Sequence, residues 1–152
     1  DIVVGAGTDS TYSTNGVIAF DGFDGSVIWN VPVPDEIFTS AVFNDINNDL
    51  IPDVFIGGRN AQFYAIDGNN GAIIWEQTFG GTDNDRGADM IELNNGNIMF
   101  VWNTIVPGND YWSTIQSKID PMTGAVMLQQ PFTTPFTYFS HKIIKITSYM
   151  NF

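Results

Sequence analysis

Residues 17–29 read Val-Ile-Ala-Phe-Asp-Gly-Phe-Asp-Gly-Ser-Val-Ile-Trp, and residues 63–75 read Phe-Tyr-Ala-Ile-Asp-Gly-Asn-Asn-Gly-Ala-Ile-Ile-Trp. Each stretch consists of an apolar run, an Asp-x-x-x-Gly turn and a second apolar run that ends in Trp. This is the pattern of two strands joined by a tight turn. A weaker third copy occupies residues 116–128, where Leu128 stands in place of the tryptophan. The sequence therefore predicts three related β-hairpins.

The spacing of the copies predicts the architecture. The aligned aspartates Asp21, Asp67 and Asp120 are 46 and 53 residues apart, close to the period of roughly 40 to 50 residues typical of four-stranded propeller blades. Turn residues interrupt the apolar runs throughout, and helical periodicity is absent. We expect an all-β fold of about three four-stranded antiparallel blades. Because a propeller closes with about four to eight blades, we expect these blades to be part of a larger propeller.

A second match extends the repeat beyond the hairpin. The strand-forming residues 1–5 match residues 53–57, so each repeat includes a further strand before its hairpin. The expected units are β-propeller repeats over residues 1–43, 44–92 and 93–130, followed by a divergent C-terminal segment over residues 131–152.

Composition excludes several classes of function. The chain has a net charge of −12 and no cysteine, which rules out disulfides, thiolate zinc sites and cysteine nucleophiles. Residues 1–92 hold 15 of the 17 acidic residues against two bases, and such a field repels nucleic acid. No apolar stretch approaches the roughly 20 residues needed to span a bilayer. We expect neither a nucleic-acid partner nor a membrane span.

The strongest local motif is the acidic stretch of residues 45–53. Oxygen-bearing side chains recur there at positions 1, 3, 5 and 9, and calcium prefers six to eight such oxygen ligands. Leu50 stands where calcium loops usually place Gly for a sharp turn. A solvated acidic turn is the alternative interpretation. The predicted calcium ligands are Asp45, Asn47, Asp49, the Ile51 carbonyl and Asp53.

Other acidic and turn segments carry weaker signals. Residues 92–97 keep turn chemistry but have too few carboxylates for a metal. The cluster of Asp83, Asn84, Asp85 and Asp89 contains Arg86 and has poor ligand spacing, so we expect a solvated turn there rather than a second metal loop.

The aromatic residues fall into two groups. Trp29 and Trp75 end equivalent strands, and we expect them to pack one blade against the next. Trp102, Tyr111 and Trp112 lie outside the clear repeat, beside an exposed loop predicted at residues 107–110. Stacking on sugar rings is the less favoured alternative for this second group.

Motifs for catalysis are absent from the sequence. His141 is the single histidine, which argues against a transition-metal site or a catalytic triad. The sequence contains no phosphate-binding loop and no dinucleotide fingerprint. We therefore expect no catalytic residues, no organic cofactor site and no enzymatic activity.

Two repeat families resemble this sequence over about residues 1–130. The hairpins ending at Trp29 and Trp75 resemble the tryptophan-docking repeat of pyrroloquinoline quinone propellers. The acidic loop and residues 53–58 resemble the FG-GAP repeat of integrin-type propellers, which also occurs in large secreted bacterial proteins. The FG-GAP resemblance implies calcium at the five positions given above. A quinoprotein dehydrogenase would also need an adjacent cysteine pair, which this chain lacks.

Taken together, these features predict a non-catalytic, calcium-stabilised propeller used for extracellular binding, adhesion or structural assembly. Expected partners are a protein or glycan at the cell surface, and other copies or chains that complete the propeller. Expected locations are extracellular, cell-surface or periplasmic. A fragment of a quinoprotein-like oxidoreductase and an envelope assembly scaffold are the alternatives.

Overall fold

The computed structural model describes residues 1–8, 12–81, 85–105 and 112–131, and these residues form strands and turns without any helix. The strands are β1 (Ile2–Gly5), β2 (Ser13–Phe20), β3 (Val27–Val33), β4 (Val42–Asn44), β5 (Asp53–Gly57), β6 (Gln62–Ile66), β7 (Ile73–Thr78), β8 (Arg86–Glu92), β9 (Ile98–Ile105), β10 (Trp112–Ile119) and β11 (Val126–Pro131). Every pairing between them is antiparallel. The predicted all-β class is confirmed. No helix in the described part of the chain could cross a membrane.

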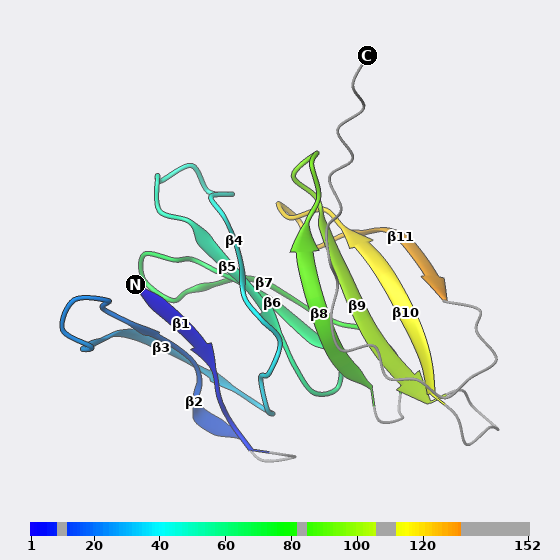
Figure 1. The fold of residues 1–152 in the computed structure, drawn as a ribbon, viewed down its shortest axis with the longest axis horizontal. Coiled ribbons are helices and arrows are strands. Elements are labelled where there is room, and N and C mark those ends of the chain that lie inside the picture. The colour runs from blue at the N-terminus through cyan, green and yellow to red at the C-terminus, as the bar shows by residue number, and fades with distance from the viewer. Residues whose placement is uncertain (9–11, 82–84, 106–111, 132–152) are drawn as a thin grey trace, which may run out of the picture.

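The strands form three separate sheets that stand side by side in chain order, as Figure 1 shows. The first sheet contains β1, β2 and β3, the second contains β4 to β7, and the third contains β8 to β11. Within each sheet, strands that follow one another in the chain are hydrogen-bonded neighbours. This up-and-down arrangement is that of propeller blades. The second and third sheets have the predicted four strands, and the first has three.

The sheets group the chain differently from the predicted repeats. Strand β8 pairs with β9, so residues 86–92 belong to the third sheet and not to the unit predicted over residues 44–92. Similarly, β4 begins at Val42, two residues before that unit. The prediction followed the hairpins and the match between residues 1–5 and 53–57, and neither of these marks β4 or β8, the first strands of the two four-stranded sheets. Residues 132–152, nearly all of the divergent C-terminal segment, lie outside the described residues.

The three hairpin turns have the predicted geometry. In each turn the carbonyl of the aspartate accepts a hydrogen bond of 2.9 Å from the N–H of the glycine four residues later. These glycines have φ angles of 73°, 77° and 71° at Gly25, Gly71 and Gly124. Because a left-handed backbone is costly for residues with a Cβ atom, the glycine of the Asp-x-x-x-Gly pattern is the residue that the turn requires.

The hydrophobic core lies between the sheets, in two layers. The first interface lies between the first and second sheets and the second interface between the second and third. The buried apolar residues of the first interface are Val17, Ala19, Trp29, Val31, Val33, Ile37, Val54, Ile56, Tyr64 and Ile66. Those of the second interface are Ile46, Phe55, Ala61, Phe63, Ala65, Phe79, Met90, Ile98, Phe100, Trp102 and Ile119. Strands β5 and β6 contribute alternate side chains to both interfaces, which is why β5 is buried along its whole length.

Candidate functional site

The acidic loop, residues 45–52, connects β4 to β5 at the end of the sheets that also carries the three hairpin turns. We call this end the loop end. Asp53, the first residue of β5, is fully buried beneath the loop. Its Oδ2 accepts a hydrogen bond of 2.9 Å from the N–H of Ile46, and its Oδ1 accepts one of 3.2 Å from the N–H of Gly68. Asp53 therefore joins the acidic loop to the neighbouring hairpin turn.

Two other carboxylates of the loop are bonded to its own backbone. Asp45 accepts hydrogen bonds from the N–H groups of Asn48 at 2.7 Å and Leu50 at 3.0 Å. Asp49 accepts one from the N–H of Ile51 at 2.8 Å. These hydrogen bonds hold the loop in a compact turn around its own carboxylates.

Three carboxylate oxygens surround the side-chain amide of Asn47. Its Nδ2 lies 3.3 Å from Asp49 Oδ2, 3.4 Å from Asp53 Oδ1 and 3.3 Å from Asp67 Oδ2. Asp67 belongs to the hairpin turn of the second sheet and was not among the predicted ligands. The repeat pattern could have indicated that Asp67 lies near the loop. Because β5 and β6 are antiparallel neighbours, the loop before β5 and the turn after β6 lie at the same end of the sheet.

The structure thus brings Asn47, Asp49 and Asp53 together, while Asp45 faces the backbone amides of its own loop. Within the described residues, no group of three or more His, Cys, Asp or Glu side chains is arranged to hold a metal ion. The five-residue calcium set therefore stays a prediction.

Leu50 occupies the position where the sequence departs from calcium-binding loops. Its φ angle is 72°, so the loop does need a left-handed backbone there. Its side chain is 90% exposed. A leucine in this conformation loses backbone stability without gaining burial, so neither local geometry nor packing explains why it is a leucine.

The two repeat tryptophans bind the hairpin turn of the next sheet. The Trp29 indole donates a hydrogen bond of 2.8 Å to the carbonyl of Gly68, and the Trp75 indole donates one of 2.8 Å to the carbonyl of Pro121. A Cβ atom at Gly71 would lie 3.0 Å from the Trp29 ring, and one at Gly124 would lie 2.9 Å from the Trp75 ring. The prediction that these tryptophans pack blade against blade is confirmed.

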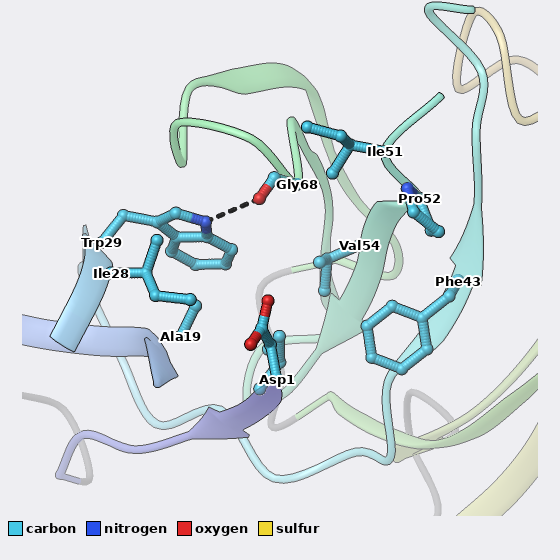
Figure 2. Close-up of a pocket in the computed structure, with 10 residues that line it drawn as sticks. Asp1, Ala19, Ile28, Trp29, Phe43, Ile51, Pro52, Val54 and Gly68 are labelled. Carbon is cyan, nitrogen blue, oxygen red and sulfur yellow. Dashed lines mark hydrogen bonds between the residues drawn. The ribbon is translucent and has the colours of Figure 1, made fainter. Parts of the chain in front are cut away.

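A cavity of about 340 Å³ opens between the first and second sheets at the loop end, beside Trp29. Figure 2 shows its lining, which is apolar except for the carboxylate of Asp1, the indole N–H of Trp29 and backbone groups. The lining residues are Asp1, Val3, Ala19, Ile28, Trp29, Phe43, Ile51, Pro52, Val54 and Gly68. An apolar cavity with one acid has the character of a packing or binding space and lacks the paired groups of general acid–base catalysis.

The opposite end of the sheets carries ion pairs that the sequence analysis did not identify. The guanidinium of Arg59 lies 2.9 Å from Glu36 Oε2 and 3.6 Å from Asp35 Oδ1. Asn60 donates a hydrogen bond of 2.8 Å to Asp35 Oδ2. These contacts attach the segment between β3 and β4 to the β5–β6 turn. The guanidinium carbon of Arg86 lies 5.8 Å from the centre of the Trp112 ring, within cation–π range.

Two expectations from the sequence are wrong. Trp102 is buried in β9, and its indole donates a hydrogen bond of 3.0 Å to Ser117 Oγ, so it belongs to the core of the propeller repeats and does not lie outside them. Asp85 and Asp89 are buried and do not form a solvated turn. The other residues of those two predictions, Asp83, Asn84, Tyr111 and residues 107–110, lie outside the described residues, as does His141.

Comparison with known proteins supports the fold. No protein-family model matches the chain, and no curated protein matches it. Among solved structures, the crystal structure of BamB from Moraxella catarrhalis matches with a TM-score of 0.56 and 17% sequence identity. The match covers 86% of this chain and 38% of that one. BamB is a β-propeller, and the three blade-like sheets have the same arrangement. The chain is therefore a propeller-type β-repeat protein.

Proposed function

We propose that this chain is a non-catalytic propeller scaffold that binds other proteins through its loop end. The observation that carries the proposal is the exposure of apolar side chains at the tips of the loops. Phe23 is 99% exposed, Leu50 is 90% exposed and Met122 is 56% exposed. They lie in the first hairpin turn, the acidic loop and the third hairpin turn.

Phe23 and Leu50 add little to the stability of the fold. An apolar side chain left in water gains no burial, and Leu50 also holds an unfavourable backbone conformation. Apolar anchors surrounded by polar groups are typical of protein-binding surfaces. Here the polar surroundings are acidic, with Asp21 and Asp24 beside Phe23 and Asp49 beside Leu50. A partner with apolar pockets and a basic rim fits this surface.

Photo-crosslinking in cells tests the proposal. A photoreactive amino acid placed at Phe23 or Leu50 is expected to give adducts with a defined protein. Thr14, an exposed residue in β2, serves as the control position. Adducts that form equally well at Thr14, or none at Phe23 and Leu50, would contradict a protein-binding role for the loop end. Adducts that disappear on treatment with a glycosidase would instead indicate a glycan ligand.

Calcium binding at the acidic loop is the second part of the proposal. The carboxylates of Asp49, Asp53 and Asp67 gather around the side-chain amide of Asn47, and although they are not arranged to hold a metal as they stand, hard carboxylate oxygens are the ligands that suit calcium. Bound calcium would supply positive charge that neutralises these acids and orders the loop. Weak calcium loops are filled at extracellular calcium concentrations, which agrees with the proposed location outside the cell or in the envelope.

Calcium titration followed by calorimetry and thermal melting tests this part. We expect calcium to raise the melting temperature, and we expect Asp49→Ala to lose the shift. Asp24→Ala removes one carboxylate from a different turn of the loop end, and this variant should keep the calcium-induced rise in melting temperature. If calcium does not raise the melting temperature of the parent chain, or if both variants lose the rise equally, the acidic loop is a solvated turn and not a calcium site.

A further inference from the structure

The cavity beside Trp29 has the size and the opening of a ligand site. Its volume of about 340 Å³ lies within the range of roughly 300 to 1,000 Å³ that is typical of small-molecule sites. Three large apolar side chains of its lining are partly exposed to water: Phe43 is 50% exposed, Ile28 44% and Ile51 39%. Trp29 and Val54, which also line it, are buried. A buried apolar floor with an exposed apolar rim is typical of a binding pocket.

One charged side chain points into this apolar space. Figure 2 shows the carboxylate of Asp1 directed into the cavity, between the rings of Trp29 and Phe43. Within the described residues, its one hydrogen bond is the bond of 3.2 Å that Oδ1 accepts from the N–H of Gly22. The only basic side chain in residues 1–81 is Arg59, which lies at the opposite end of the sheets in ion pairs with other acids. The carboxylate of Asp1 therefore has no basic side chain of the first two sheets beside it.

The aromatic rings of the cavity add a second attraction for positive charge. The indole N–H of Trp29 is already bonded to the carbonyl of Gly68 at 2.8 Å, so the ring offers the cavity its carbon surface and no free donor. Aromatic rings attract organic cations, and a carboxylate pairs with them through charge-assisted hydrogen bonds. We propose that the cavity binds a small organic cation, with an ammonium or guanidinium group at Asp1 and an apolar body packed against Trp29 and Phe43. This inference does not rest on protein binding by the loop tips or on calcium.

The equivalent space in the second interface is filled. Phe55 takes the place of Val3 there, and Ile46 of the acidic loop is buried in the same cluster. Asp53, at the position of Asp1, is fully buried, and backbone N–H groups donate hydrogen bonds to both of its oxygens. Of the two interfaces, the first alone combines open space with an accessible carboxylate. The second interface therefore serves as an internal control.

Titration with phenethylammonium, followed by NMR spectroscopy of the indole N–H groups, tests the proposal. We expect this probe to shift the resonance of Trp29 and to leave that of Trp75, in the second interface, unchanged. Phenethyl alcohol, the neutral analogue, should bind at least about tenfold more weakly because it lacks the charge that the carboxylate and the rings attract. Hydrocinnamate, an anion of similar shape, should not bind.

Two pairs of variants separate the acid from the aromatic ring. Asp1→Asn removes the charge but keeps an oxygen for the N–H of Gly22, so it should bind the ammonium about as weakly as the parent binds the alcohol. Asp24→Asn changes an exposed acid of the neighbouring turn that does not line the cavity, and it should bind like the parent. Phe43→Ala should weaken binding of the ammonium by about threefold or more. Phe23→Ala removes an exposed ring outside the cavity and should have no effect.

A third pair tests the space itself. Val3→Phe fills the cavity and should abolish binding, whereas Val4→Phe places the same ring on the exposed side of β1 and should leave binding intact. The proposal is overturned if phenethylammonium does not shift the Trp29 resonance, or if the alcohol binds as tightly as the ammonium. It is also overturned if Asp1→Asn or Val3→Phe binds the ammonium as tightly as the parent does.

Discussion

The two interfaces between the sheets use the same docking bond but different packing. In the second interface, Phe63 stacks on Phe100 with ring centres 5.0 Å apart and meets Trp75 edge-on at 5.2 Å. In the first interface, the position of Phe63 is taken by Val17, and that of Phe55 by Val3. The cavity of about 340 Å³ lies in this aliphatic interface.

A loop residue adds to the difference. Ile46, from the acidic loop that leads into β5, is buried in the second interface. Among the described residues, no loop at this end of the sheets contributes a buried side chain to the first interface. The indole hydrogen bond is 2.8 Å long in both interfaces, so this bond sets how neighbouring sheets dock. The side chains packed between the sheets determine how strongly the two sheets are held together.

The largest effect is expected from removing the central ring of the second interface. Phe63→Ala should destabilise the chain by about 3 to 5 kcal/mol, because a buried phenylalanine loses its transfer free energy and leaves a cavity. Val17→Ala, at the equivalent position of the first interface, should cost about 1 to 2 kcal/mol because fewer buried methyl groups are lost. Urea denaturation measures both values. Equal losses would show that the aromatic cluster adds nothing beyond aliphatic packing.

The sequence predicted the hairpins, their glycines and the docking tryptophans because the interactions that form them are local or recur at equivalent positions. It did not predict the role of Trp102, because the third repeat has Gln116 and Lys118 where the others have apolar residues, and this obscured the strands around Trp102. Two long-range features were also missed: Asp67 approaches the acidic loop from another turn, and Arg59 pairs with residues more than 20 positions away.

The first interface should also be sensitive to high pH, because Tyr64 is buried in it. Loss of solvation raises the pKa of Tyr64 well above its ordinary value, and the nearby charges of Glu76 and Asp35 raise it further. In the unfolded chain a tyrosine ionises near pH 10. Above that pH the unfolded chain releases a proton that the folded chain keeps, so stability falls as pH rises, by about 1.4 kcal/mol per pH unit.

Urea denaturation between pH 9 and 11.5 measures this slope. Tyr64→Phe loses the hydrogen bond of 2.8 Å that the hydroxyl donates to Gln62 Oε1, so it should be less stable at neutral pH. It should nevertheless lose less stability on going to high pH than the parent does. An unchanged slope in Tyr64→Phe would show that the phenol is not held neutral by the first interface.

The smallest effect is expected from filling the cavity, which would make the first interface more like the second. Val3→Phe introduces the side chain that the second sheet has at Phe55, and Val3 lines the cavity. Cavity filling of this kind should stabilise the chain by about 1 kcal/mol. Val4→Phe makes the same change on the exposed side of β1 and should have almost no effect. If Val3→Phe is destabilising while Val4→Phe is neutral, the first sheet cannot adjust to a larger side chain, and the aliphatic packing is required by the distance between the sheets.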